Sequence, residues 1–368
     1  LNQFAVDTQA QAKFGTGAVD HTLLMGVDYQ RTRNDIDAAF GSAFPISAFN
    51  PQYGNDALDG AAFPYQYLNR QEQTGLYSQD QMEWNRWVLT LGGRYDYAMT
   101  SALNRNGNTE VKNHDQAFTW RGGLNYVFDN GIAPYFSYSE AFIPNAGSTY
   151  DGQAFDPSRA KQYEAGVKYV PKDRPVVLTA ALYQLTKTKN LTADPNPDRA
   201  FFSVQSGEIR SRGVELEAKA ALNANVNLTA SYTYTDAEYT EDTVLKGKTP
   251  VQVPKHMASL WGDYTFHETA LSGVTLGAGV RYVGESKGLY AENTQNGSNS
   301  NQNFDVAGYT TVDAALKYDL GRFGLPGSTV GVNINNLFDR EYVASCYRDY
   351  ACYWGADRQI VGTATFRF

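Results

Sequence analysis

The chain lacks most of what an enzyme or a helical membrane protein would use. Among its 368 residues are only two cysteines, four methionines and four histidines. No run of 18 apolar residues occurs, which excludes a transmembrane helix. HExxH, GxSxG and phosphate-loop motifs are all missing. The histidines are dispersed at His21, His114, His256 and His267. The sequence therefore offers no catalytic centre.

A strong positive charge is also missing. The net charge is -8 and no basic block occurs, so we expect no nucleic-acid partner. The first residues, LNQFAVDTQAQ, have neither the basic start nor the apolar centre of a signal peptide. They already follow a strand pattern, so we expect the chain to be a mature piece or a fragment of a longer protein.

Aromatic residues and glycine are abundant, and they alternate with polar residues. The chain has 26 tyrosines, 19 phenylalanines and 33 glycines. In the last strand, Ile360, Phe366 and Phe368 share one face, while Thr363 and Arg367 share the other. A soluble sandwich would pack the apolar face on a core. An outer-membrane barrel would turn that face to lipid and the polar face to its lumen.

This alternation predicts fifteen strands along the chain. They are expected at residues 2–14, 20–33, 70–82, 86–98, 117–127, 132–142, 160–170, 176–188, 202–220, 225–238, 255–266, 274–284, 308–320, 328–338 and 357–368.

The connections between these strands alternate between short and long. The long ones are expected at 34–69, 99–116, 143–159, 189–201, 239–254, 285–307 and 339–356. A soluble all-β array has no reason to keep its long loops at one end, whereas a bacterial outer-membrane barrel has short periplasmic turns and long extracellular loops. We therefore predict an all-β protein, a transmembrane antiparallel β-barrel of the outer membrane.

The first strand leads into a short turn and the last strand follows a long loop. Because short turns are periplasmic and long loops extracellular, both strands run toward the periplasm, which places the C-terminus there. Bacterial barrels have an even number of strands, so the odd count predicts at least one ascending strand before Leu1. The hypothesis is that residues 1–368 form the C-terminal part of a larger barrel.

Several long segments resemble TonB-dependent siderophore receptors, above all those for ferric hydroxamates such as ferrichrome. The matching segments are LNQFAVDTQ (1–9), TLGGRYD (90–96), FTWRGG (118–123), PYFSYSE (134–140), KQYEAGVKYVP (161–171), QVPKHMASLW (252–261), NNLFDREYVASC (335–346) and CYWGADRQIVGTATFRF (352–368). The resemblance implies a monomeric barrel of twenty-two strands around an N-terminal plug, so that the plug and the first strands are absent here. It also implies import at the extracellular mouth, driven by the TonB complex, and docking of phages and colicins.

Cys346 and Cys352 lie in one long loop, and we expect them to form a disulfide. Closing so short a loop stabilises the fold by about 2–3 kcal/mol. Metal binding and redox catalysis are the alternatives, but no histidine accompanies the pair and the spacing is unusual for a metal site.

The resemblance implies that Tyr347 and Phe40 contact the siderophore, because each matches a ligand-binding aromatic of the family. A ferric hydroxamate is compact and largely uncharged, so aromatic walls suit it better than a cationic cluster. The ferric siderophore would be the transported ligand and not a cofactor. The alternative is that both are ordinary loop aromatics. Tyr347 replaces a phenylalanine of the family, and the 285–307 loop differs in length, so ferrioxamine or another siderophore stays open as the ligand.

Arg31 and Arg33 continue the outward parity of Val27 and Tyr29 at the extracellular end. They match arginines that contact lipopolysaccharide phosphates in the family, and guanidinium suits bidentate phosphate binding. A solvated strand end is the alternative. Arg210 and Arg212 could form a second pair, but Gly207 and Gly213 permit a bulge that leaves their parity open.

Many charged residues are expected to face the lumen, including Arg94, Asp96, Arg121, Glu164 and Glu215. They could contact a plug or line an open channel, so a passive porin is one alternative function. An outer-membrane hydrolase is another. It would need a histidine paired with a nucleophile or carboxylate at the barrel top, and His114 is the histidine expected in a long loop.

Overall fold

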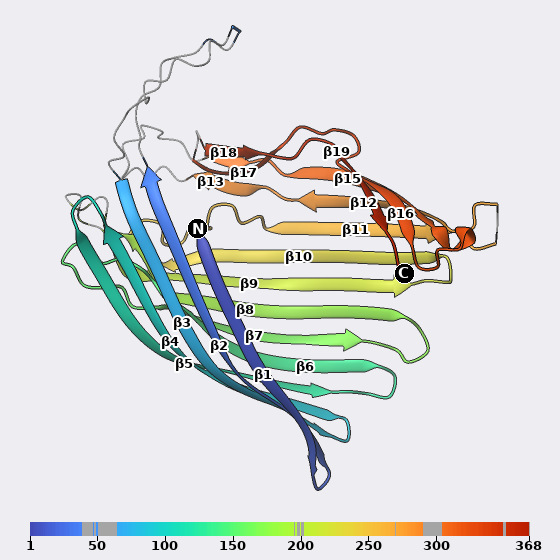
Figure 1. The fold of residues 1–368 in the computed structure, drawn as a ribbon, viewed down its shortest axis with the longest axis horizontal. Coiled ribbons are helices and arrows are strands. Elements are labelled where there is room, and N and C mark those ends of the chain that lie inside the picture. The colour runs from blue at the N-terminus through green and yellow to red at the C-terminus, as the bar shows by residue number, and fades with distance from the viewer. Residues whose placement is uncertain are drawn as a thin grey trace.

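The computed structural model describes residues 1–38, 47, 49–50, 65–194, 196, 199, 202–268, 270–289, 304–348 and 351–367. Their main element is a fifteen-stranded antiparallel sheet, as the alternation predicts. The sheet is strongly twisted and curved (Figure 1). In this view the strand ends joined by the predicted short turns lie to the right and below, and the strand ends that carry the long connections lie to the left. No helix in the described part is long and apolar enough to cross a membrane.

Each strand of the main sheet pairs with its neighbours along the chain, so β1 and β19 form its two edges. The strands are β1 (Asn2–Thr16), β2 (Val19–Ala38), β3 (Tyr65–Trp84), β4 (Trp87–Asn104), β5 (Thr109–Tyr126), β6 (Ile132–Ile143), β7 (Ser158–Tyr169), β8 (Val176–Ala193), β9 (Ser203–Ala221), β10 (Val226–Glu241), β11 (His256–Thr265), β12 (Val274–Val283), β15 (Tyr309–Asp319), β16 (Thr329–Asn335) and β19 (Gln359–Thr365).

Two small two-stranded sheets and a 3-10 helix lie in the described parts of the connections. β13 (Ser286–Leu289) pairs with β14 (Phe304–Val306), and β17 (Val343–Arg348) pairs with β18 (Ala351–Trp354). A 3-10 helix, η2 (Leu320–Phe323), occupies the turn between β15 and β16. Both two-stranded sheets fall in connections that the sequence predicts as loops.

The prediction of a long loop at 99–116 is wrong. β4 and β5 continue through it, pairing Met99 with His114, and only residues 105–108 form the turn. Asn104 stabilises this turn, because its side chain accepts hydrogen bonds from the backbone of Asn106 and Gly107. The extension escapes the pattern because polar residues occupy both faces there, so alternation carries no signal. His114 consequently lies in a strand and not in a loop. The predicted loop at 189–201 is likewise shortened, since β8 reaches Ala193.

Large apolar side chains cover the outer face of the sheet. The register places Leu76 between Val27 and Tyr95, and Tyr95 beside Phe118. The exposed apolar side chains include Phe4, Val6, Val27, Leu76, Leu91, Phe118, Leu124, Phe136, Val167, Leu182, Leu216, Leu260, Leu276, Leu316, Val332 and Ile360. Exposure on this scale suits contact with lipid and is incompatible with a soluble all-β protein.

The inner face is polar, and its large aromatic side chains lie flat over glycines of the neighbouring strand. A Cβ atom at Gly26 would lie 2.3 Å from the Tyr77 ring, and one at Gly277 would lie 2.4 Å from the Trp261 ring. The same arrangement recurs for Tyr135 over Gly166 and Tyr183 over Gly213. Glycine therefore provides shallow slots in which these rings lie against the wall.

Among the described residues, Arg94 of β4 is the most heavily bonded charge on this inner face. Its guanidinium donates to both carboxylate oxygens of Asp96, each 2.9 Å from Nε, and forms an ion pair with Asp28 of β2. Gln73 also donates to Asp96, whose side chain is 1% exposed. The guanidinium crosses β3 directly over Gly75, where a Cβ atom would lie 2.0 Å from Nη2. Three strands are thus joined through one side chain.

We predict that Gly75→Ala displaces Arg94 from this position and leaves the buried carboxylate of Asp96 without its cation. A buried acceptor that loses its partner costs about 1–3 kcal/mol of stability. Thermal unfolding of the full-length protein in detergent measures the loss. Gly362→Ala is the matched control, because a Cβ atom there meets nothing within 4 Å. Equal unfolding midpoints for the two variants would contradict this role of Gly75.

Candidate functional site: the mouth and the inner wall

The last long connection, residues 336–358, is held at its base by Asn336. This residue has a positive φ of 53° and is 5% exposed. Its side chain donates to the carbonyl oxygens of Arg340 and Ala356, at 2.9 and 3.1 Å, and accepts from the Arg340 backbone at 2.9 Å. Its backbone N–H donates to Asp313 on β15. One asparagine therefore joins the outgoing and returning segments of the loop to the sheet.

Within this loop the structure forms the predicted disulfide. Cys346 of β17 and Cys352 of β18 stand directly opposite one another and are bonded. The side chain of Cys346 is buried, and β13 and β14 pack against β17. Figure 1 shows the two small hairpins together at the end of β12 and β15 that carries the long connections.

The two predicted siderophore ligands lie at the limits of the described structure. Phe40 lies outside the described residues. Tyr347 belongs to β17, next to Cys346, and its backbone alone is described. Their contact with a ligand therefore stays a prediction.

A second connection, residues 144–157, folds inward against the wall of the sheet. Phe155 is 5% exposed, and its carbonyl oxygen accepts from Asn113 of β5. Thr100 of β4 donates to the carbonyl oxygen of Asn145, and Gln205 of β9 accepts from the Asp156 backbone at 2.6 Å. The loop is thus attached to the inner side of β4, β5 and β9. It narrows the opening, which the sequence pattern does not predict.

This inward loop also builds an aromatic cluster with the connection between β8 and β9. The rings of Tyr150 and Phe202 meet edge to face with centroids 5.0 Å apart, and both side chains are exposed. The guanidinium of Arg199 lies 4.1 Å from the Tyr150 ring centroid. Asp151 and Asp194 neutralise Arg199, at 3.6 and 3.9 Å. The mouth thereby offers an aromatic surface, and the cation beside it, Arg199, is already paired with carboxylates.

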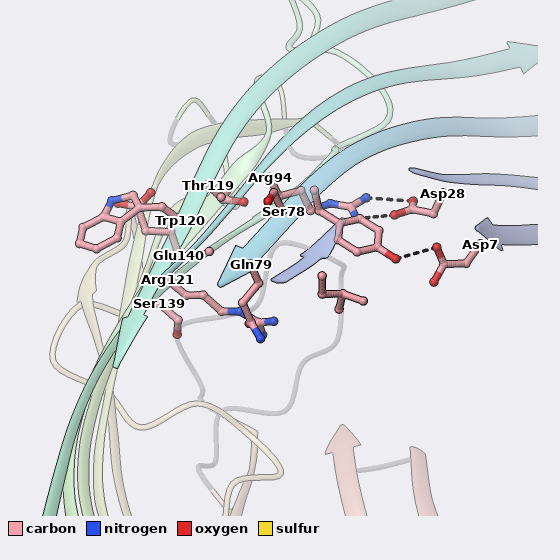
Figure 2. Close-up of a pocket in the computed structure, with 14 residues that line it drawn as sticks. Asp7, Asp28, Ser78, Gln79, Arg94, Thr119, Trp120, Arg121, Ser139 and Glu140 are labelled. Carbon is pink, nitrogen blue, oxygen red and sulfur yellow. Dashed lines mark hydrogen bonds and ion pairs between the residues drawn. The ribbon is translucent and has the colours of Figure 1, made fainter. Parts of the chain in front are cut away.

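Below the mouth, the inner wall has a cavity of about 460 Å³ beside the Arg94 cluster (Figure 2). Tyr77 forms part of its wall and donates a 2.8 Å hydrogen bond to Asp7. Arg121 of β5 points into it beside Gln79. No ion pair of Arg121 is found within the described residues. A cation is thus available on this side of the lumen.

On the part of the wall formed by β7 and β9, the available charges are negative. Glu164 accepts hydrogen bonds from Tyr135 at 2.6 Å and from Gln162 at 3.0 Å. Glu215 and Glu217 share its face. In the described part of the chain, none of these three carboxylates has a cation within 4 Å. The lumen therefore has charges of both signs that form no ion pair within the described part of the chain.

Arg31 and Arg33 lie on the outer face of β2, as their parity predicts. Arg31 stands 3.3 Å from Glu72, and Arg33 stands 3.0 Å from Asp35. Asp35 also pairs with Arg105. Both guanidinium groups are partly exposed but already have carboxylate partners. Their contact with lipopolysaccharide stays a prediction.

The hydrolase alternative requires a histidine pair at the mouth. The structure does form such a pair, but at the opposite end. His21 lies 2.6 Å from Asp80 and 2.7 Å from the Thr16 hydroxyl, beside the short β1–β2 turn. These residues share the outer face, and the Phe14 ring stacks on His21. The arrangement is remote from the mouth and gives no support to hydrolysis there.

Residues 1–337 match the family model described as "TonB dependent receptor-like, beta-barrel". The ferrichrome outer membrane transporter/phage receptor of Escherichia coli K12 is 58% identical over all of this chain and 49% of that protein. The ferrioxamine B receptor of Salmonella typhimurium is 39% identical over all of this chain and 51% of that protein. The chain thus spans about half the length of these relatives.

Solved structures show the same fold at low sequence identity. The ferric-catecholate import receptor Fiu from Escherichia coli superimposes with a TM-score of 0.75 at 21% identity, over 100% of this chain and 54% of that one. The ferripyoverdine receptor of Pseudomonas aeruginosa gives a TM-score of 0.78 at 19% identity, over 98% of this chain and 48% of that one. The likeness extends to the strand arrangement of an outer-membrane receptor barrel.

We predict that Asn336→Gly loosens the 336–358 loop while preserving its backbone, because glycine accepts positive φ without strain. The variant loses three side-chain hydrogen bonds, each worth about 0.5–1.5 kcal/mol. Limited proteolysis of the full-length protein should then cleave this loop faster. Asn333→Gly, on the exposed inner face of β16, is the control. Equal cleavage rates in the two variants would show that Asn336 does not hold the loop.

Proposed function

Because the chain belongs to the TonB dependent receptor-like β-barrel family, we propose that it forms the ligand-binding barrel of a receptor that imports a ferric hydroxamate siderophore of the ferrichrome kind. Its sheet is an outer-membrane barrel wall, with apolar residues outside and polar residues inside. The 58% identity to a ferrichrome transporter over the whole chain supports this ligand class.

The observation that carries the proposal is the chemistry of the described mouth. Exposed rings lie in two of its connections, with Tyr150 and Phe202 in contact with one another and Tyr353 and Trp354 on β18. Arg199 is neutralised by aspartates. An uncharged ferric complex is bound well by aromatic walls and a few hydrogen-bond donors. An anionic catecholate complex would favour unpaired cations instead. Phe40 and Tyr347 are proposed to complete this wall.

Ferrioxamine is the second candidate ligand, since a ferrioxamine B receptor also aligns with the entire chain. Both ligands are hydroxamates, so the mouth described here suits either. Tyr347 and the 285–307 loop are the proposed determinants, because they depart from the ferrichrome pattern. A passive porin is disfavoured by the inward-folded 144–157 loop, which narrows the opening.

We also propose that the chain is the C-terminal part of a larger barrel that encloses a plug. The sheet has two unpaired edges, β1 and β19, and the relatives are about twice as long. A plug with basic groups would pair with Glu164 and Glu215, and an acidic group would pair with Arg121. Energy from the TonB complex would reach the ligand through this plug. The barrel would function as a monomer.

The outer rim and the long loops suggest further partners. Arg31 and Arg33 are proposed to contact lipopolysaccharide phosphates by exchanging part of their bonding with Glu72 and Asp35. The long loops would serve phages and colicins as docking sites, and the Escherichia coli relative is itself described as a phage receptor.

Ligand binding by the full-length receptor in detergent tests the proposed substrate. Tryptophan quenching should show tight binding of ferrichrome and weaker binding of ferrioxamine B and of a ferric catecholate. Phe40→Ala with Tyr347→Ala should weaken ferrichrome binding at least about tenfold, because two aromatic walls are lost. Tyr264→Ala, on the lipid side of β11, is the control. Preference for ferrioxamine B would agree with a hydroxamate ligand but not with ferrichrome. Binding of no ferric complex would contradict the proposed receptor function.

The proposed plug contact is tested separately with Glu164→Gln and Glu215→Gln together. Removing two carboxylates should weaken plug docking by about 1.5–3 kcal/mol for each lost charged hydrogen bond. Ion conductance of the full-length receptor in planar bilayers should rise under mild urea. Asp263→Asn, on the same inner face beside Asn227, should leave conductance unchanged. Unchanged conductance in the double variant would contradict the contact.

A further inference from the structure

Four cationic side chains gather on the outer face of β7, β8 and β9, away from Arg31 and Arg33. Arg159 and Lys161 come from β7, and Arg210 and Arg212 come from β9. The register sets Lys161 and Arg210 on either side of Thr186, and Arg212 beside Gln184. We refer to Arg159, Lys161, Arg210 and Arg212 as the second basic cluster.

The structure settles the parity of the arginines, which the sequence leaves open. Pairing of β8 with β9 is regular from Val176 to Lys187, and the register shifts only beyond Lys187. Arg210 and Arg212 therefore share their face with Val214, which pairs with the exposed Leu182. Their side chains point to the membrane side and not to the lumen.

The height of the cluster places it at the lipid headgroups. Tyr163 is exposed on the same face, in the register row of Gln184 and Arg212, and its ring lies 5.0 Å from that of Tyr138. Such tyrosines mark the boundary between hydrocarbon and headgroups in outer-membrane barrels. Lys161 and Arg159 lie one and two rows farther out, at the end of the long connections.

The second basic cluster is less neutralised than Arg31 and Arg33. Arg210 is paired with Glu238 at 2.9 Å, and Arg212 donates to the neutral Gln184 at 2.9 Å. Arg159, Lys161 and Arg212 have no carboxylate within 4 Å in the described part of the chain. Two acids stand nearby in the register. Glu140 lies opposite Lys161 and accepts from Tyr138, and Asp236 lies opposite Arg212 without forming an ion pair. By contrast, Arg31 and Arg33 both have carboxylate partners.

We propose that this cluster is a second binding site for the phosphate groups of lipopolysaccharide in the outer leaflet. Lys161 and Arg210 are two strand spacings apart, about 10 Å, with the Thr186 hydroxyl between them. Cations and a hydroxyl in this arrangement donate to phosphate oxygens from both sides. The lipid chains of the same molecule would lie on the apolar surface below, at Leu182 and Val167. A membrane lipid contacts both the basic cluster and the apolar surface below it, whereas free phosphate contacts only the basic cluster.

The test uses the full-length receptor, delipidated in detergent and carrying Arg31→Gln and Arg33→Gln to remove the first site. Bisphosphorylated lipid A is titrated and bound molecules are counted by native mass spectrometry. Adding Arg159→Gln, Lys161→Gln and Arg212→Gln should weaken the remaining binding at least about tenfold, because each charged contact is of that order. Lys219→Gln with Lys317→Gln, on the inner face, should leave binding unchanged.

Two further binding measurements distinguish the source of the phosphate. Dephosphorylated lipid A should bind at least about tenfold more weakly than the bisphosphorylated form, and millimolar inorganic phosphate should not displace the lipid. Unchanged lipid binding in the variant, equal binding of the dephosphorylated form, or displacement by inorganic phosphate would each overturn the proposal. Ferrichrome binding should be the same in all these variants, so failure of this site is separable from failure of the proposed receptor function.

Discussion

The structure depends on one constraint, which is that a single sheet must face lipid on one side and an aqueous lumen on the other. Each interior strand therefore satisfies its backbone hydrogen bonds with its two neighbours, while β1 and β19 each pair on one side in the described sheet. Successive side chains alternate between the two environments. The large apolar side chains lie outside, so very few of those described are buried. Stability comes from the ladder of strands and from polar contacts along the inner wall.

Those inner contacts connect the fold to the function. Arg94 joins three strands, and the inner aromatic rings lie flat over glycines, which leaves space in the lumen for other groups. Within the described residues, charges without an ion-pair partner are distributed unevenly, with Arg121 on β5 and Glu164, Glu215 and Glu217 on β7 and β9. At the mouth the balance differs, because Arg199 is neutralised by Asp151 and Asp194. The wall is thus suited to contact charged protein groups, and the mouth is suited to contact an uncharged ligand.

Alternation was sufficient to predict the fifteen strands, the outer and inner faces and the end that carries the long connections. It failed at 99–116, where polar residues on both faces of β4 and β5 remove the contrast on which the pattern depends. It could not predict how loop 144–157 folds inward, because Asn145, Phe155 and Asp156 bond to residues from three different strands. The disulfide was predictable because both cysteines lie in one short segment. The parity of Arg210 depended on the exact position of a bulge, which needs coordinates.

The central claim is that the sheet has a lipid face and a lumen face, and spin labels along β10 of the bilayer-reconstituted full-length receptor test it most directly. Single labels would replace each residue from Asn227 to Tyr232, with the native disulfide kept intact. The account predicts that labels at Leu228, Ala230 and Tyr232 are relaxed by oxygen from the lipid, while those at Asn227, Thr229 and Ser231 are not. Loss of this period of two, or equal access of a water-soluble nickel complex to both sets, would contradict it.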